Sequence, residues 1–298
     1  MHVPVLLQST IELLQIKAGD KIVDATLGLG GHAKELAEQT GQTGLLIGLD
    51  ADANLLAKAE ENLRNVPCQT IFINTNFRYL ASALDKEGIA KVDKILFDLG
   101  LNSEHFDSSG RGFTFQKDEP LLMTLSPEIT EETLTAREIV NTWAEESLAD
   151  IIYGYGEERL SRRIAHAIVE ARKTKKIETT FDLVEIVKAV MPANRLHSKT
   201  HFATKTFQAL RITVNDEIGA LKEGLAGAWE KLDSNGRLAV ISFHSLEART
   251  VKNFFKEKVA EGVGLLVNKK AIAPSRGEEL SNPRSRSAQL RVIKKINE

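Results

Sequence analysis

Two groups of residues have the types and the spacing to bind a nucleoside. The first is the run Asp24-Ala-Thr-Leu-Gly-Leu-Gly-Gly-His32, which directly follows a short apolar segment. Glycines suit a tight turn and let a ligand lie against the backbone. The second is Asp50, at the end of the next apolar segment, where a carboxylate can accept hydrogen bonds from ribose hydroxyls. Together they predict a nucleoside-containing ligand, against the alternative of a structural turn with Asp50 capping the next helix.

The glycine pattern alone does not choose the cofactor. Gly28, Gly30 and Ala33 also satisfy the loose dinucleotide fingerprint, so a nicotinamide-dependent dehydrogenase is a rival interpretation. A dinucleotide would place its pyrophosphate at the N-terminus of the helix that follows. Asp24, at the start of the loop, is better suited to the amino group of a methionine moiety. This carboxylate therefore favours S-adenosylmethionine as the cofactor and a methyltransferase as the class of enzyme.

A further polar motif, Asp98-Leu-Gly-Leu-Asn102, follows a later apolar segment. In open α/β sheets, ligands bind outside the carboxyl ends of the strands. Amino-group methyltransferases place a short polar motif that begins with an acid or Asn at this strand end, where its oxygens accept hydrogen bonds from the target amine. We therefore predict Asp98 and Asn102 as catalytic residues; the alternative is a simple Asp-Gly turn.

The segment His244-Ser-Leu-Glu247 raises the question of a hydrolase or a metal site. No Gly-x-Ser-x-Gly motif accompanies it, and one His–Glu pair supplies too few ligands for a metal ion. Cys68 is the only cysteine, so the chain cannot form an internal disulfide. We expect no metal, and the cysteine usage indicates the reducing cytoplasm.

These residues need a parallel sheet to bring them together. Short apolar or β-branched runs predict five strands of the parallel type, at Lys21–Asp24, Leu45–Asp50, Thr70–Ile73, Lys94–Asp98 and Arg237–Phe243. Helical patterns separate the first four, as in βαβ units. Two more segments, Gly264–Asn268 and Gln289–Lys295, are expected to pair as a hairpin. The fold class is thus α/β, a doubly wound Rossmann-like methyltransferase sheet.

The regular spacing breaks after Asp98, where a long interval of loop and helix precedes the next strand. A crossover needs only about a dozen residues. We therefore expect an inserted helical subdomain for substrate recognition at residues 110–200, with the main domain formed by residues 1–109 and 201–298. One continuous helix is predicted to follow the insert and to pack back onto the sheet through the stripe Phe207, Leu210, Val214, Ile218 and Leu221.

The formal net charge is −2, but the charges are unevenly distributed. Residues 118–146 hold eight acids and one base, residues 159–176 seven bases and one acid, and residues 284–295 five bases and no acid. In the second stretch, Arg162 and Arg163 could contact phosphates, or their helix could be salt-bridged against the acidic stretch. No apolar run approaches the roughly 20 residues of a bilayer span, so no membrane partner is expected.

Taken together, these motifs resemble those of the ribosomal RNA small subunit methyltransferase H family, also called MraW, over almost the whole chain. The shared blocks are His2–Leu7, Asp24–His32, Asp98–Gly100, Arg111–Phe115, Tyr155–Arg159, Ser161–Ala165, Ala203–Thr204, Thr206–Glu217, Ile241–Glu247 and Asn282–Ser287. The resemblance implies methyl transfer from S-adenosylmethionine to N4 of a cytidine in the decoding centre of 16S ribosomal RNA. The small ribosomal subunit would be the partner, with neither DNA nor a membrane; the chain could be a monomer or a homodimer.

The resemblance also implies particular site residues. The cofactor contacts carried over position by position are Gly30, Gly31, His32, Asp50, Phe77, Asp98 and, where the family has Gln, His105. Arg111, Phe113 and Phe115, in one glycine-flanked loop, are expected to contact the RNA, and the two aromatic side chains could stack on a base that is flipped out of it. The alternative for these aromatics is a core plug between the sheet and the insert.

The chain departs from the family pattern around the start of the insert. The family's Leu-Asp-Met-Arg-Met-Asp run is replaced by Leu121–Ser126, which lacks charges at Leu122, Thr124 and Ser126. Ser9 stands in place of a Glu, and Phe202 in place of a Pro after His201. These changes suggest, as the alternative function, a non-catalytic RNA-binding or ribosome-assembly protein with the same fold.

Overall fold

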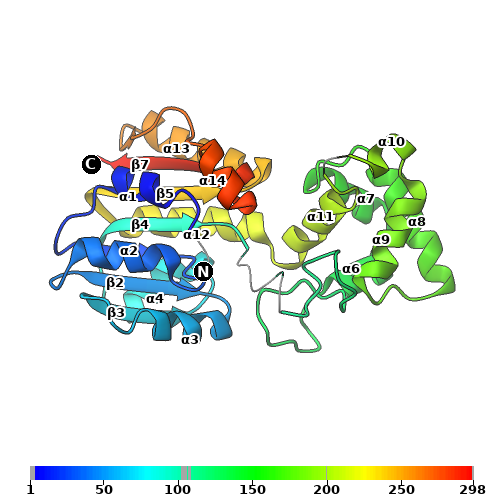
Figure 1. Ribbon diagram of the computed structural model, residues 1–298, viewed down its shortest axis with the longest axis horizontal. Helices are drawn as coiled ribbons and strands as arrows, with labels where there is room; N and C mark the ends of the chain where they lie inside the picture. The colour runs from blue at the N-terminus through cyan, green and yellow to red at the C-terminus, as the bar shows by residue number, and fades with distance from the viewer. Residues whose placement is uncertain (1–3, 102–105, 107–108, 199, 297–298) are drawn as a thin grey trace. The chain divides into compact units, whose positions relative to one another are not determined.

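The computed structural model describes residues 4–101, 106, 109–198 and 200–296. The chain divides into two compact units. Unit 1 consists of residues 1–100 and 218–298, and unit 2 of residues 101–217. Each unit has a hydrophobic core of its own. Figure 1 shows unit 1 as a sheet with helices on both faces and unit 2 as a group of helices.

The sheet of unit 1 has seven strands in the order β3-β2-β1-β4-β5-β7-β6. All neighbours from β3 to β5 are parallel, and β7 is antiparallel to both β5 and β6. This arrangement confirms the doubly wound sheet and the C-terminal strand pair. The strands are β1 (Lys21–Asp24), β2 (Leu45–Asp50), β3 (Gln69–Asn74), β4 (Val92–Asp98), β5 (Leu232–Ser242), β6 (Gly264–Leu266) and β7 (Gln289–Lys295).

Strand order reverses between β1 and β4. The chain runs from β1 outward to β3 on one side, and then returns to place β4 and β5 on the other. At such a reversal the connections leave toward opposite faces, so a crevice opens outside the carboxyl ends of the two central strands. The two strands that flank this point end at Asp24 and Asp98.

Alternate residues of the strands face two different layers of helices. In β4, Ile95 and Phe97 belong to one apolar cluster, with residues of α4, α12 and α13, while Leu96 belongs to the other, with residues of α1 and α2. The helices of unit 1 are α1 (Leu7–Leu14), α2 (Gly31–Thr40), α3 (Ala53–Asn62), η1 (Phe77–Tyr79), α4 (Leu80–Lys86), α12 (Glu217–Lys231, from the unit boundary), α13 (Ser245–Ala260), α14 (Arg276–Ser281) and η2 (Pro283–Ser287).

Unit 2 is helical and packs around its own cluster of buried side chains. Its helices are α6 (Ala136–Thr142), α7 (Glu145–Gly154), α8 (Ser161–Thr174), α9 (Thr180–Val190), α10 (Ala193–Leu196) and α11 (Thr204–Val214). The unit begins earlier and ends later than the expected insert of residues 110–200. The C-terminal extension arises because α11 buries Phe207 and Leu210 in this helical core.

The prediction of one continuous helix from Phe207 to Leu221 is wrong. Helix α11 ends at Val214, and Asp216 has a φ of 44°. A left-handed residue interrupts the helical hydrogen bonding. The stripe is therefore divided between the two units, with Phe207 and Leu210 in the core of unit 2 and Leu221 in the core of unit 1.

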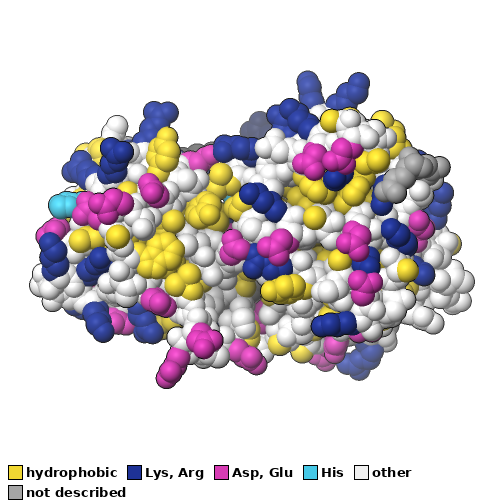
Figure 2. All heavy atoms as spheres, turned by 180° about the vertical axis from the view of Figure 1, so that it is seen from behind, with side chains coloured by type: hydrophobic (Ala, Val, Ile, Leu, Met, Phe, Trp, Pro, Cys, Tyr) yellow, Lys and Arg dark blue, Asp and Glu magenta, His cyan; other side chains and the backbone are white. Residues whose placement is uncertain are grey.

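Charged side chains of both signs cover the surface. On the face drawn in Figure 2, Lys and Arg side chains are interspersed with Asp and Glu side chains. This mixture agrees with the net charge near zero. Among the described residues, none of the helices combines the length and the apolar character needed to cross a membrane.

Candidate active site

Three carboxylates end three adjacent strands of unit 1. Strands β1, β2 and β4 end at Asp24, Asp50 and Asp98. In the parallel register Asp24 is aligned with Gly48 and Leu96, so the other two carboxylates each lie two residues further along their strands. The three groups interact electrostatically, since both Asp50 and Asp98 raise the pKa of Asp24. The edge of the sheet that was predicted to bind the cofactor therefore concentrates negative charge.

The glycine loop after β1 has a backbone that side chains would disturb. Gly28 and Gly30 have φ values of 55° and 81°. A Cβ atom at Gly30 would lie 2.9 Å from Leu63 Cδ1, and one at Gly31 would lie 2.8 Å from Pro4 Cγ. The loop then enters α2 at Gly31. At Gly30 and Gly31, side chains of other segments thus approach the loop backbone closely, and glycine accommodates them because it has no Cβ atom.

Asp50 anchors this loop. One of its oxygens, Oδ2, accepts a hydrogen bond from the Gly28 N–H at 2.7 Å, and Oδ1 accepts one from the Asp52 N–H at 2.8 Å. The cap of α3 is Asp52, whose side chain accepts from the N–H groups of Asn54 and Leu55. The alternative of Asp50 as a helix cap is therefore not what the structure shows. A carboxylate oxygen has two lone pairs, so Asp50 retains capacity to accept from a ribose hydroxyl.

His32 is buried between the N-terminal segment and Asp98. Its Nε2 lies 2.9 Å from the Val5 carbonyl oxygen, and its Nδ1 lies 3.5 Å from Asp98 Oδ2. Because a carbonyl can only accept, Nε2 carries the hydrogen. Burial lowers the pKa of His32, against the opposing influence of the Asp24 charge. His32 is thus neutral at physiological pH and presents the bare lone pair of Nδ1 to Asp98.

Asp98 is the residue with the most unusual environment. Burial raises its pKa to about 7, although the Gly100 N–H favours the ionised form. Its backbone N–H donates to Thr26 Oγ1 at 2.6 Å. Oδ1 is buried and has no hydrogen-bond partner among the residues that the structure describes. A buried acceptor without a partner is costly unless a ligand supplies a donor.

The charge of this site suits S-adenosylmethionine better than a nicotinamide dinucleotide. Burial raises the pKa of Asp24 to about 6, so Asp24 and Asp98 are both carboxyl groups that a cationic ligand would stabilise in their ionised forms. S-Adenosylmethionine carries an ammonium and a sulfonium, whereas the pyrophosphate of a dinucleotide would add negative charge to three carboxylates. The glycine loop and the unpartnered Asp98 Oδ1 therefore fit S-adenosylmethionine.

Phe77 follows β3 and begins the short helix η1. It is half-buried, and its ring meets that of Phe97 edge to face, with centroids 5.5 Å apart. Its place after β3 is at the same end of the sheet as the three carboxylates, as expected for a residue near the nucleoside. The predicted catalytic residue Asn102 and the predicted cofactor contact His105 lie outside the described residues.

Two of the residues expected to contact RNA hold unit 2 together. Arg111 is buried, and its Nη1 donates to the carbonyl oxygens of Thr124 and Leu125. Phe113 is also buried, with the Arg111 guanidinium 5.6 Å from its ring centre. Their surroundings favour a packing role in the core of unit 2 over contact with a base.

Phe115, by contrast, is partly exposed. It stacks on the imidazole of His201 with centroids 4.4 Å apart and an interplanar angle of 10°. His201 also lies beside Phe202, which in the sequence stands out only as a departure from the family pattern. The spacing of nearly ninety residues between Phe115 and His201 gives no local signal of this aromatic group.

Arg162 and Arg163 lie on the exposed side of α8. Neither makes an ion pair or hydrogen bond with any described residue, and the same holds for Arg159 just before the helix. The nearby Glu145 is engaged with His166 at 3.2 Å. The alternative of a helix salt-bridged through these arginines is therefore not supported.

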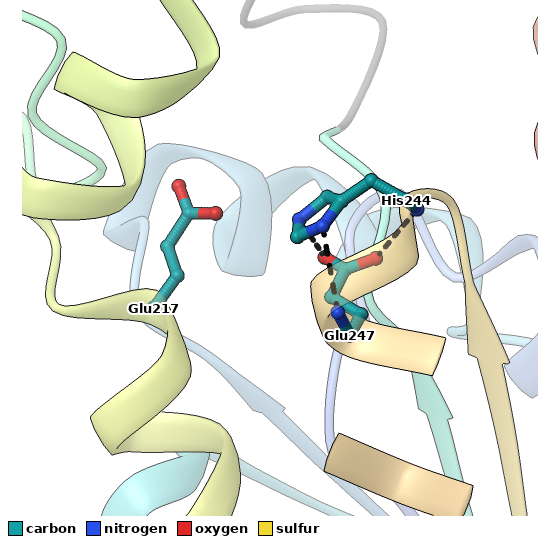
Figure 3. Close-up of side chains that lie close together, drawn as sticks. All are labelled: Glu217, His244 and Glu247. Atoms are coloured by element: carbon teal, nitrogen blue, oxygen red, sulfur yellow. Dashed lines mark hydrogen bonds and ion pairs between the residues drawn. The ribbon is translucent and has the colours of Figure 1, made fainter. Parts of the chain in front are cut away.

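The His244–Glu247 segment is a helix cap (Figure 3). His244 precedes α13, its side chain accepts from the Glu247 N–H, and the Glu247 carboxylate accepts in return from the His244 N–H. Such a reciprocal pair satisfies free N–H groups at the first turn of a helix. The third side chain drawn, Glu217, belongs to unit 2, where it accepts hydrogen bonds from Arg211 at 2.8 and 3.0 Å.

Comparison with known proteins gives one consistent family. The model of the MraW methylase family matches residues 1–296. The chain is 43% identical to the ribosomal RNA small subunit methyltransferase H of Symbiobacterium thermophilum, over 99% of this chain and 96% of the relative. It is 44% identical to the protein of the same name from Dictyoglomus thermophilum, over 98% and 96%. Among solved structures, an rRNA methylase from Streptococcus thermophilus aligns over 100% of this chain and 99% of its own, with a TM-score of 0.45 and 13% identity.

Proposed function

This chain belongs to the MraW methylase family, and we propose that it transfers a methyl group from S-adenosylmethionine to N4 of a cytidine in 16S ribosomal RNA. The relatives that share over 40% of their residues with it are named as ribosomal RNA small subunit methyltransferases. The proposal also rests on the site: a cationic methyl donor suits the carboxylates at the ends of β1, β2 and β4.

The single observation that carries the proposal is the buried Oδ1 of Asp98, which has no hydrogen-bond partner within the described part of the chain. When bound, S-adenosylmethionine supplies an electrophilic methyl group on a sulfonium. The lone pair of cytosine N4 is delocalised into the ring, so orientation of the amine can contribute much of the rate enhancement. An ionised Asp98 would accept a hydrogen bond from the amine and favour a more tetrahedral nitrogen as positive charge develops. The same carboxylate would stabilise the bound cofactor.

The other residues proposed for this site would bind and orient the cofactor and the target base. The positive φ values of Gly28 and Gly30 shape the loop, and Asp50 would accept from the ribose hydroxyls while holding the Gly28 N–H. We keep Phe77 as a contact to the nucleoside, and Asn102 and His105 as proposals from the sequence. Asn102 would accept a hydrogen bond from the target base.

Three exposed arginines, two in α8 and one just before it, supply the RNA contact in this proposal. Arg159, Arg162 and Arg163 carry three positive charges that no described side chain neutralises. Guanidinium groups bind phosphates by paired hydrogen bonds and release counterions as they do so. Phe115 and His201, a partly exposed stacked pair in unit 2, are further candidates to contact bases. With the small ribosomal subunit as partner, the chain would act in the cytoplasm.

The direct test is mass-spectrometric mapping of N4-methylcytidine in 16S ribosomal RNA from cells with and without the gene. We expect the modification to disappear on deletion and to return with the wild-type gene but not with Asp98→Ala. Return of the modification with Asp98→Ala would favour a different catalytic centre. No change on deletion would favour the non-catalytic assembly protein. Binding of NAD in place of S-adenosylmethionine by the purified chain would favour the dehydrogenase.

A further inference from the structure

One peptide unit near the N-terminus lies between two ionisable side chains. The Leu6 N–H donates to Glu278 Oε1 at 2.7 Å, across 272 positions of sequence. The carbonyl of the same peptide, that of Val5, accepts from His32 Nε2 at 2.9 Å. A peptide unit is planar and rigid, with its N–H and C=O directed to opposite sides. A displacement at the Glu278 end therefore moves the carbonyl that His32 binds.

A second contact leads from His32 into the cofactor site. The Val5 carbonyl fixes the hydrogen of His32 on Nε2, so the bare Nδ1 faces Asp98 Oδ2 at 3.5 Å. Two lone pairs repel unless a proton lies between them, and the raised pKa of Asp98 favours that proton on the carboxyl group. The other oxygen, Oδ1, is the buried atom without a partner among the described residues. The orientation of Asp98 thus depends on which nitrogen of His32 carries hydrogen.

The segment that carries this peptide is closely fitted to the glycine loop. Leu6 has a left-handed backbone with φ 54° and ψ 29°, which is unusual for a residue with a large side chain. Pro4 lies so near Gly31 that a Cβ atom there would be 2.8 Å from Pro4 Cγ. The hydrogen bond from the Leu6 N–H to an anionic acceptor offsets the energetic cost of this left-handed conformation. It also polarises the peptide, which makes the Val5 carbonyl oxygen a stronger acceptor.

We propose that Glu278 is a positioning residue for the cofactor site: through the Val5–Leu6 peptide it sets the tautomer of His32 and thereby the orientation of Asp98 toward S-adenosylmethionine. The inference rests on the proposed use of that cofactor. It assigns a role at the site to α14, a short C-terminal helix in which Ser275 provides the N-cap and Glu278 faces the N-terminal segment.

The test compares three variants by calorimetric titration with S-adenosylmethionine. Glu278→Ala removes the acceptor, and we expect the affinity to fall by about fivefold or more, the worth of one hydrogen bond. Glu278→Gln keeps an amide oxygen in place without the charge and should recover part of the lost affinity, to a value between those of Glu278→Ala and the wild type. Glu279→Ala is the matched control, since Glu279 is the next residue of the same helix and its side chain makes no hydrogen bond or ion pair with a described residue; it should bind as the wild type does.

A second readout distinguishes positioning from a general loss of structure. Nitrogen-15 NMR of the cofactor-free chain reports which nitrogen of His32 is protonated, with His32→Gln to assign the signal. We expect the hydrogen on Nε2 in the wild type, and a mixture of tautomers in Glu278→Ala. Unchanged affinity together with an unchanged tautomer in Glu278→Ala would overturn the inference. If that variant fails to fold, Glu278→Asp, which withdraws the carboxylate by one methylene, carries the same expectation. Failure of the wild type to bind S-adenosylmethionine would instead refute the proposed function.

Discussion

Thr26 Oγ1 accepts the backbone N–H of Asp98 at 2.6 Å. This hydrogen bond joins the loop after β1 to the last residue of β4, and it lies at the point where the strand order reverses. Asp50 makes the corresponding connection from β2, because its Oδ2 accepts the Gly28 N–H. The glycine loop is therefore held by the ends of β2 and β4, the two strands on either side of β1; in the proposed function this arrangement would couple catalysis to cofactor binding.

The first prediction concerns Asp50. We expect Asp50→Ala to weaken S-adenosylmethionine binding by at least about 1.5 kcal/mol, the value of a hydrogen bond to a charged group. The variant removes both the proposed acceptor for the ribose and the anchor of the Gly28 N–H. Calorimetric titration measures the change, and Asp52→Asn, which alters the cap of α3 beside it, serves as the control. An unchanged affinity in a folded Asp50→Ala would refute the ribose assignment.

The second prediction is a pH dependence of cofactor binding. Burial raises the pKa of Asp98 to about 7, so the group is protonated below that pH and ionised above it. A cationic cofactor binds the ionised form better, and its affinity should therefore rise between about pH 6 and pH 8. The charged or titratable groups near Asp98 are His32, Asp24 and Glu247. Asp24, whose pKa is raised to about 6, should add to the rise at its acidic end.

In the cofactor-free chain, a rise in pH should lower the free energy of unfolding, whereas it should raise the affinity for the cofactor. A carboxyl group whose pKa is raised by folding binds its proton more tightly in the folded state. Its contribution is complete below the ordinary value of 3.8 and is lost as the pH rises through about 7. The free chain should thus lose stability from about pH 4 to about pH 7, so that stability falls while affinity rises only in the upper part of that range. Asp98→Asn should remove the part of both profiles near pH 7 and leave the part due to Asp24; a flat wild-type profile would contradict the assignment of the raised pKa.

The third prediction concerns the unpaired arginines of α8. The double charge reversal Arg162→Glu with Arg163→Glu should weaken binding to 16S ribosomal RNA. It should also reduce the slope of log affinity against log salt by about one for each phosphate that is no longer bound. Cofactor affinity should stay unchanged. The control is the reversal of Lys252 and Lys256, two exposed cations of α13. An equal salt slope in both double variants would remove α8 from the RNA surface.

The fourth prediction separates the two aromatic side chains of the loop after Arg111. Phe113 is buried in the core of unit 2, so Phe113→Ala should lower the free energy of unfolding by about 3 kcal/mol. Phe115 is partly exposed on His201, and Phe115→Ala should lower the free energy of unfolding less while weakening RNA binding. Chemical denaturation and RNA titration of the two variants check this. The reverse order of destabilisation would contradict the assignment of Phe113 to the core.

Local patterns in the sequence predicted the sheet and the cofactor loop. The strand ends at Asp24, Asp50 and Asp98 could be found because apolar runs stop at polar residues, and the loop because glycine tolerates positive φ. The division of the helix at Asp216 could not, because its two halves continue the same apolar stripe. A left-handed Asp leaves little trace in the pattern of apolar residues.

The sequence also could not predict contacts between residues that lie far apart in the chain. Arg111 was predicted to contact RNA, whereas here backbone carbonyl oxygens bind it inside unit 2. Glu278 gave no signal at all, since its partner is a backbone N–H 272 positions away. A backbone N–H or carbonyl is nearly the same at every residue, so the type of the partner residue carries no signal. Contacts between a side chain and a distant backbone group therefore cannot be read from the sequence.

The central claim is that the methyl group is transferred at Asp98. The most direct measurement is the single-turnover rate of N4-methylcytidine formation in 16S ribosomal RNA, with saturating S-adenosylmethionine, for the wild type, Asp98→Ala and Asn102→Ala. We predict that Asp98→Ala abolishes transfer and weakens cofactor binding, because it removes the buried acceptor whose Oδ1 has no other partner among the described residues. Asn102→Ala should slow transfer with little effect on the cofactor, as expected for an interaction made mainly in the transition state. A near-normal rate in Asp98→Ala would contradict the placement of the active centre at the end of β4.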